Sequence, residues 1–139
     1  MFNFIFILQR KILIKMQDLI IQGTIKTPSI DFKINGEMKI EGRSIPENTY
    51  DFYKPIVNWV ETLKDSIPSS ITLTVKLEYI NTSSSKLILD IFKILDEIFT
   101  SKKSEVEIVW LYDYDDDESR EEGHNYKSEL SVPFNIKAY

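Results

Sequence analysis

A run of hydroxyl side chains is the feature of this sequence best suited to carry chemistry. The run Asn81-Thr82-Ser83-Ser84-Ser85-Lys86 lies between a strand-like segment and a helix-like segment. In open α/β sheets, sites lie beyond the carboxyl ends of strands, where a helix N-terminus offers N–H groups to an anion. A hydroxyl there could be phosphorylated, which adds roughly −1.5 to −2 charges. The alternative is N-capping of the helix, although one cap does not require four hydroxyl residues.

A second candidate is an acidic run near the C-terminus. Residues 113–122 carry a net charge of −6, whereas the whole chain carries −5, so the acidity is local. Such a run could bind a divalent cation or a basic partner, or it could be a solvated face. Its spacing does not match the twelve-residue calcium loop. The alternative function that this run suggests is a metal-dependent phosphoester hydrolase built on Asp113, Asp115, Asp116 and Asp117.

The composition excludes several classes of site. The chain of 139 residues has no cysteine and a single histidine, His124, which excludes disulfide scaffolds, thiolate nucleophiles and clusters of several histidines. The net negative charge and the presence of only three arginines argue against a nucleic-acid partner. We find no paired general acid and base, nucleophile triad or phosphate-binding glycine loop, so we expect a protein that is not an enzyme and uses no cofactor or metal.

An antiparallel hairpin is predicted near the N-terminus. Segments 30–34 and 37–41 alternate apolar and polar residues around Asn35-Gly36, a dipeptide that tolerates the positive φ of a tight turn. A β-branched, apolar segment at 19–25 predicts a strand before the hairpin. The residues expected to point inward are Phe32, Ile34, Met38 and Ile40.

A parallel βαβ unit is predicted in the second half. It consists of a strand at 71–80, a helix at 84–99 and a strand at 106–112 that is apolar enough to be buried on both faces. One face of the first strand is expected to hold Ile71, Leu73, Val75, Leu77 and Tyr79. Beyond this unit, 115–126 could be a charged helix or a loop, and 132–136 a final edge segment.

A helix is also predicted between the hairpin and this unit. Ser44-Ile45-Pro46-Glu47 fits a capping box, and apolar residues at helical spacing follow as far as residue 63. Because Pro55 removes a helical hydrogen bond, either the helix kinks there or its regular part begins near Asp51. The order of elements predicts one α/β domain: a mixed β-sheet with an antiparallel hairpin and a parallel βαβ unit, and helices packed on the sheet.

The N-terminus is expected to lie outside this domain. We interpret residues 1–15 as an extension of the kind that a misassigned start codon produces, and residues 16–139 as the domain. The apolar run Met1–Leu8 is too short to span a bilayer, and its positive charges follow it instead of preceding it as in a secretory signal. The alternative is a short interfacial anchor, since Arg10, Lys11 and Lys15 accompany the apolar residues.

Several motifs together resemble the SiaC family of bacterial regulatory phosphoproteins, over about residues 17–136. The motifs are Gly23-Thr24 with Thr27-Pro28; Gly42-Arg43-Ser44-Ile45-Pro46-Glu47-Asn48; Phe52-Tyr53-Lys54-Pro55 with Trp59; residues 77–86; and Trp110-Leu111-Tyr112-Asp113 followed by Glu122-Gly123. This resemblance implies a fold similar to the STAS class, in which a hydroxyl at a strand-to-helix junction is the phosphorylated switch.

The resemblance also implies the site and its partners. The family phosphosite falls on Thr82, with Ser83 and Ser84 as alternates. The family implies a partner protein kinase, a PP2C-type phosphatase, and a diguanylate cyclase or other effector that the unphosphorylated form binds and activates, in the cytoplasm. We expect the phosphate-stabilising or partner-binding residues to be Asn81, Ser83, Ser84, Lys86, Arg43, Glu47 and Asn48. A constitutive scaffold without phosphorylation is a further, weaker hypothesis.

Overall fold

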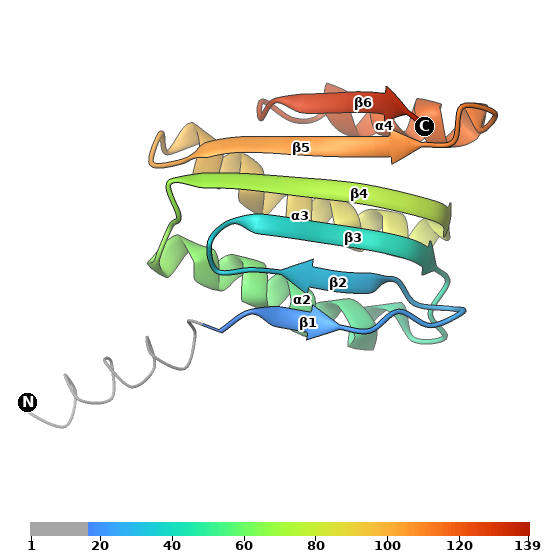
Figure 1. The fold of residues 1–139 in the computed structure, drawn as a ribbon, viewed down its shortest axis with the longest axis horizontal. Coiled ribbons are helices and arrows are strands. Elements are labelled where there is room, and N and C mark those ends of the chain that lie inside the picture. The colour runs from blue at the N-terminus through green and yellow to red at the C-terminus, as the bar shows by residue number, and fades with distance from the viewer. Residues whose placement is uncertain (1–16) are drawn as a thin grey trace, which may run out of the picture.

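The computed structural model describes residues 17–139, and the expected extension over residues 1–15 lies outside the described residues. The elements follow in the order β1 (Leu19–Ile21), β2 (Ser29–Phe32), β3 (Glu37–Ser44), α2 (Thr49–Thr62), the 3-10 helix η1 (Leu63–Asp65), β4 (Ser70–Ile80), α3 (Thr82–Thr100), β5 (Glu105–Tyr112), α4 (Asp117–Ser128) and β6 (Phe134–Ala138). The six strands form one sheet in sequential order (Figure 1). Strands β1, β2 and β3 pair antiparallel, and β3 to β6 pair parallel, which confirms the predicted mixed sheet.

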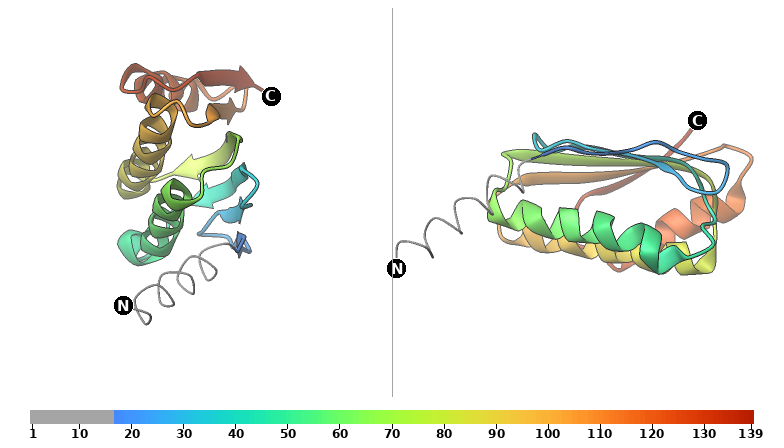
Figure 2. Two further views of the ribbon diagram at one scale, coloured as in Figure 1. Left: turned by 90° about the vertical axis from the view of Figure 1, so that its left-hand side faces the viewer. Right: turned by 90° about the horizontal axis from the view of Figure 1, so that it is seen from below.

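The sheet and the helices form two layers. Seen edge-on in Figure 2, helices α2, α3 and α4 all lie on the same side of the sheet. Alternate strand residues face these helices and form the core, which is why β4 shows strict alternation from Ser70 to Leu77. The largest fully buried side chains are Trp110, Tyr53, Phe32 and Phe92. No helix within residues 17–139 is both long and apolar enough to cross a membrane.

Each of the parallel strands β3, β4 and β5 is followed by a helix that returns along the sheet. Consequently β3 leads into α2, β4 into α3 and β5 into α4, and the three helix N-termini gather at the carboxyl edge of the sheet (Figure 1). This edge is where ligand and partner sites of open α/β sheets are usually found. The topology therefore places the Asn81–Lys86 run beside the starts of two other helices.

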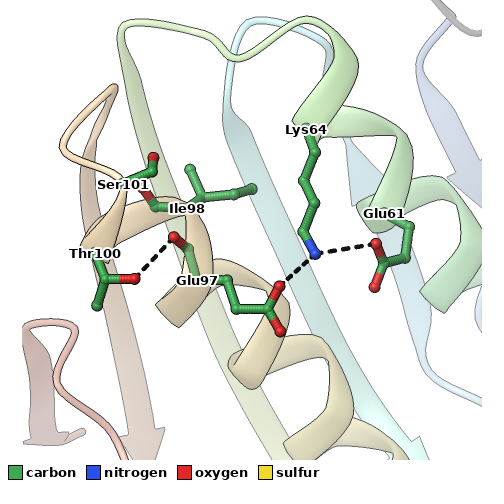
Figure 3. A network of polar contacts seen from close by, with 6 residues as sticks. All are labelled: Glu61, Lys64, Glu97, Ile98, Thr100 and Ser101. Atoms are coloured by element: carbon green, nitrogen blue, oxygen red, sulfur yellow. Dashed lines mark hydrogen bonds and ion pairs between the residues drawn. The ribbon is translucent and has the colours of Figure 1, made fainter.

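The opposite ends of α2 and α3 are joined by an ion-pair network (Figure 3). Lys64, in the 3-10 helix η1 that follows α2, contacts Glu97 of α3 and lies 3.2 Å from Glu61 in the last turn of α2. The Thr100 and Ser101 hydroxyls satisfy carbonyls in the last turn of α3, those of Glu97 and Ile98. The two ion pairs of Lys64 lie at the surface, with both partners at least partly exposed, so each contributes about 0–1 kcal/mol.

The hairpin prediction is confirmed in its pairing and wrong in two details. Phe32 pairs with Met38 across the turn, and Gly36 adopts a positive φ of 102° as the turn requires. However, β2 ends at Phe32, and therefore Ile34 lies in the turn, where it is 41% exposed instead of inward. The predicted strand at 19–25 is shorter as well, since β1 ends at Ile21 and residues 22–28 form a turn-rich loop.

The βαβ prediction is confirmed, with β4 and β5 parallel, but two burial expectations are wrong. A register shift between β3 and β4 follows Gly42, which pairs with Leu77, while Arg43 pairs with Tyr79. This irregularity takes Tyr79 off the buried face and leaves it 57% exposed. In β5, Val109 and its outward neighbours are only half-buried because the helices cover a single face of the sheet.

The first residues of helices α2 and α3 differ from the predicted ones. The N-cap of α2 is Asn48, whose side-chain oxygen accepts a hydrogen bond from the Asp51 N–H at 3.1 Å, so the predicted capping box at Ser44 is wrong. Pro55 lies inside α2, and the helix begins at Thr49, two residues before Asp51. Helix α3 begins at residue 82 and not at 84. The charged segment after β5 is a helix, α4, and β6 forms the final edge strand.

Candidate functional site

The N-terminus of α3 begins directly after the carboxyl end of β4. Asn81 is the N-cap, and its side-chain oxygen accepts a hydrogen bond from the Ser84 N–H at 2.9 Å. The Ser83 hydroxyl donates to the same oxygen at 3.2 Å. The Asn81 N–H donates to the Ser44 carbonyl at 3.0 Å, which ties the start of α3 to the end of β3. Asn81 therefore caps the helix, and the cap does not engage the hydroxyls of Thr82, Ser84 and Ser85.

Thr82 is the first residue of α3, and its side chain is exposed. No hydrogen bond within residues 17–139 engages its hydroxyl. The N–H groups of the first helical turn and the positive end of the helix dipole surround this position. Thr82 thus meets the geometric requirements of a phosphate acceptor: an accessible oxygen and a favourable local field.

The next hydroxyl, that of Ser83, points toward α2. Its oxygen lies 2.8 Å from the Thr49 hydroxyl at the start of that helix, and both residues are near the surface. This contact joins the N-termini of α2 and α3. Ser83 is exposed, so it stays accessible to a modifying enzyme.

The third hydroxyl, that of Ser84, is fully buried. It accepts a hydrogen bond from the Ser44 hydroxyl at 2.8 Å and donates to the Ser44 carbonyl at 3.3 Å. The Tyr53 hydroxyl of α2 lies 2.5 Å from the Ser44 hydroxyl oxygen, and burial raises the pKa of Tyr53 to about 12. This buried network joins β3, α2 and α3 beneath the helix start. Its burial argues against the predicted use of Ser84 as an alternate phosphate acceptor.

The fourth hydroxyl, that of Ser85, points toward α4. It donates to the Glu122 carboxylate at 2.8 Å, and the Tyr126 hydroxyl donates to the Ser85 carbonyl at 3.0 Å. Burial raises the pKa of Glu122, and the nearby negative charges of Glu118 and Asp116 add to the effect. Burial likewise raises the pKa of Tyr126. A half-buried carboxylate therefore holds α4 against the start of α3.

Two surface hollows flank Thr82. One, of about 520 Å³, lies between α3 and α4 and is walled by Glu118, Glu121 and Glu122. The other, of about 660 Å³, lies between the starts of α2 and α3 and is mostly apolar, with Tyr50 and Leu87 in its lining. Thr82 and Lys86 line both hollows. Thr82 consequently stands on a rim between an acidic surface and an apolar one.

Three other residues predicted for the site have different roles. The Arg43 guanidinium lies 6.0 Å from the centre of the Tyr79 ring and lines neither hollow. Glu47 pairs with Lys26 at 2.8 Å, an exposed ion pair that lowers the pKa of the glutamate. Asn48 caps α2. Of the predicted set, the structure brings Asn81, Ser83, Ser84 and Lys86 together around Thr82.

The acidic residues of the run mostly serve local structure. Asp116 is the N-cap of α4 and accepts from the Ser119 N–H at 3.0 Å, while Asp113 accepts from the Asp115 N–H at 3.0 Å. Asp117 lies 3.8 Å from Arg120. In the part of the chain that the structure describes, no group of three acidic or histidine side chains is arranged to hold a metal ion.

Sequence reasoning missed the partners that surround the hydroxyl run. Ser44 was expected to be a cap, and Tyr53 was named only within the motif Phe52-Tyr53-Lys54-Pro55, yet their hydroxyls meet in the buried network. Glu122 and Tyr126 gave no local signal, because their role depends on how α4 packs against α3. Glu122 and Tyr126 are four residues apart, which puts them on one face of α4. Only this spacing could have suggested a shared contact.

Comparison with known proteins settles the family. The family model of SiaC family regulatory phosphoproteins matches residues 21–139. This chain belongs to the SiaC family. A protein of Pseudomonas aeruginosa strain UCBPP-PA14 is 33% identical over 126 residues, which cover 89% of this chain and 98% of the relative.

Solved structures of a SiaC protein share the fold. The crystal structure of apo-SiaC from Pseudomonas aeruginosa has a TM-score of 0.81 and 33% identity, and the match covers 88% of this chain and 100% of that one. A second crystal structure contains the diguanylate cyclase SiaD in complex with its activator SiaC, also from Pseudomonas aeruginosa. Its matching chain has a TM-score of 0.82 and 32% identity, with 88% and 100% of the two chains covered. The mixed sheet and one-sided helices of this chain are therefore the fold of the SiaC family.

Proposed function

We propose that this SiaC family member is a protein-binding regulator that is switched by phosphorylation of Thr82. The observation that carries the proposal is the placement of this hydroxyl: exposed, first in α3, and on the rim shared by two hollows. A phosphate there would change the charge of both hollows at once. Membership in a family of regulatory phosphoproteins supports the same conclusion.

The local field favours a phosphate on this residue. The helix dipole and the free N–H groups of the first turn stabilise a negative charge by about 0.3–1 kcal/mol at an exposed site. Lys86 follows four residues later, on the same face of α3, and adds a positive charge. Arg43, which contacts Tyr79 and lines neither hollow, is not included in the proposed phosphate site.

The proposed partner of the unphosphorylated form is a diguanylate cyclase or another signalling effector, which it binds and activates. The similar SiaC of Pseudomonas aeruginosa activates the cyclase SiaD. The apolar hollow beside Thr82, with Tyr50 59% exposed, offers area that a protein contact would bury. A phosphate on Thr82 would have to be desolvated in such an interface, which carries a penalty of several kcal/mol without a matching cation. Phosphorylation would therefore oppose binding.

The proposed modifying enzymes are a partner protein kinase and a PP2C-type phosphatase in the cytoplasm. In this account the kinase supplies the catalysis, and this chain supplies only the acceptor hydroxyl. The next candidate acceptor is Ser83, which is exposed and one residue away. Ser84 would become an acceptor only after local opening of α3, because its hydroxyl is buried in the network with Ser44.

The acceptor is tested by phosphate incorporation in vitro. The wild-type protein, Thr82→Ala and Ser83→Ala are incubated with the cognate kinase and ATP, and their intact masses are measured. We expect one phosphate on the wild type and on Ser83→Ala, and none on Thr82→Ala, because among the hydroxyl residues 82–85 only Thr82 combines exposure with an unengaged hydroxyl. If Thr82→Ala incorporated as much phosphate as the wild type, the acceptor would be a residue other than Thr82.

A further inference from the structure

The acidic hollow brings the phosphate site and a carboxylate of α4 together. Thr82 and Ser85 are three residues apart in α3, so their side chains lie on one face of the helix. Both line the hollow between α3 and α4, and Glu118, Glu121 and Glu122 line its other wall. A negative charge placed on Thr82 therefore lies in the same hollow as the negative charges of α4.

The same hollow contains the contact that joins the two helices. Ser85 donates to Glu122 at 2.8 Å, its oxygen lies 2.7 Å from the Tyr126 hydroxyl, and that hydroxyl donates to the Ser85 carbonyl. Among the described residues that line the hollow, Lys86 is the single basic side chain, against four glutamates. The negative charge of Glu122 is held there by hydrogen bonds from Ser85 and Tyr126 and without an ion pair in the described part of the chain.

We propose that helix α4 responds to the phosphorylation state of Thr82, because a phosphate there repels the Glu122 carboxylate and loosens the Ser85–Glu122–Tyr126 contact between α3 and α4. This inference rests on the proposed function, since it takes Thr82 as the acceptor. Like charges in one hollow repel, and a phosphate brings roughly −1.5 to −2 charges where a neutral hydroxyl stood. The Ser85–Glu122–Tyr126 contact joins α3 to the short helix α4 and does not involve the sheet. Helix α4 can therefore loosen locally while the sheet stays folded.

The neighbouring residue provides a matched control. Ser83 lies one position along the same helix turn and shares the same dipole, but its hydroxyl faces Thr49 of α2, and Ser83 lines only the apolar hollow. A carboxylate at position 83 therefore receives the same favourable field from the helix and is directed away from the acidic wall. The difference between the two positions isolates the effect of Glu122 and its neighbours.

A double-mutant cycle on the full chain tests the inference. The equilibrium constant of unfolding is measured by urea titration for the wild type, Thr82→Glu, Glu122→Gln and the double variant, at pH 7.5 and low salt. Because Glu122→Gln keeps a hydrogen-bond acceptor for Ser85 and removes the charge, we expect Thr82→Glu to be less destabilising in that background. The expected coupling is roughly two- to fivefold in the unfolding constant, and it should shrink in 0.5 M NaCl.

The control cycle uses Ser83→Glu in place of Thr82→Glu. We expect it to show a coupling with Glu122→Gln of less than about twofold, since that carboxylate faces α2. Equal coupling in the two cycles, or no coupling in the Thr82 cycle, would overturn the inference.

Hydrogen exchange on the phosphorylated protein gives the second readout. With phosphate on Thr82, amides of 117–128 should exchange several-fold faster than in the unmodified protein, while those of β4 stay unchanged. Unchanged exchange in α4 overturns the inference even when Thr82 carries phosphate. Failure of the kinase to modify Thr82 overturns the proposed function instead, and coupling in the Thr82 cycle would then still support the electrostatic link to α4.

Discussion

Four consecutive hydroxyl residues at the start of α3 have four different environments. A helix turns by about 100° per residue, so neighbours in sequence point in different directions. Thr82 faces solvent, Ser83 faces α2, Ser84 faces the core, and Ser85 faces α4. One short motif thereby supplies the proposed acceptor hydroxyl and three hydroxyls whose contacts fix its surroundings.

The buried hydroxyl network is testable at Tyr53. In Tyr53→Phe the ring still fills its place in the core, but the hydrogen bond to Ser44 is lost. We expect the free energy of unfolding to fall by about 1 kcal/mol, a typical value for one buried hydrogen bond, as measured by urea denaturation. Tyr50→Phe is the matched control, since Tyr50 is exposed and its change should stay within about 0.5 kcal/mol. Equal effects of the two variants would contradict a structural role for the network.

Glu122 should make stability depend on pH in a defined direction. Burial raises its pKa in the folded protein, so the folded state binds this proton more tightly than the unfolded state does. The contribution of Glu122 is therefore most favourable below its ordinary pKa of 4.5 and falls as the pH rises through the raised folded-state pKa. Glu122→Gln lacks this titration. We therefore expect the melting temperature of Glu122→Gln, relative to that of the wild type, to be higher at pH 7.5 than at pH 4. A difference that does not change with pH would refute a raised pKa of Glu122 in the folded protein.

At the residue scale, the hydroxyl run could be predicted, but the division of its roles could not. The Asn81–Lys86 composition indicated a cap with surplus hydroxyls, and the resemblance pointed to Thr82. Which of Ser83, Ser84 and Ser85 is buried depends on where α3 begins, and the predicted start was two residues late. The partners Tyr53 and Glu122 come from other elements, and their approach is set by tertiary packing.

At the scale of elements, the docking of α4 on the sheet depends on a close approach at Gly123. A Cβ atom there would lie 2.6 Å from Trp110 Cδ1, and the indole cannot move easily because its N–H donates to the Ser119 carbonyl at 2.9 Å. Gly→Ala in a helix normally stabilises by up to about 1 kcal/mol, but overpacking here should reverse the sign. We expect Gly123→Ala to destabilise the protein by about 1–3 kcal/mol in urea denaturation.

The control for this substitution is His124→Ala, one residue further along the same helix and exposed. It should change stability by no more than about 0.5 kcal/mol, because it touches no packed surface. If Gly123→Ala stabilised the protein as helix propensity alone predicts, α4 would not pack on Trp110 as described.

Local sequence patterns predicted the helices and strands correctly, except where tertiary contacts determine the structure. The alternation in 71–77 and the Asn35-Gly36 turn gave strands and pairing that the structure confirms. The pattern at Ser44 fitted a capping box, yet that residue ends β3 and Asn48 caps α2 instead. Tyr79 continued the apolar alternation in sequence, and only the register shift against β3 reveals its exposure.

At the scale of the described molecule, residues 17–139, helices α2, α3 and α4 lie on one face of the sequentially ordered sheet, with their N-termini at one edge. The opposite ends of α2 and α3 are held by the Lys64 network, away from this edge. A modification at the carboxyl edge can therefore change the surface presented to a partner without entering the core. The strand order and the one-sided packing are the parts of the fold that composition and periodicity leave open, because the same pattern of strands and helices fits other topologies.

Binding of the effector by the two forms of the protein tests the central claim most directly. The unmodified protein and the protein carrying one phosphate on Thr82 are each titrated by calorimetry into the proposed partner, a diguanylate cyclase, with Thr82→Ala treated with kinase as the control. We predict that phosphate weakens binding by at least about tenfold, which corresponds to about 1.4 kcal/mol, and that the kinase-treated control binds like the unmodified protein. Equal affinity of the phosphorylated and unmodified forms would contradict the account.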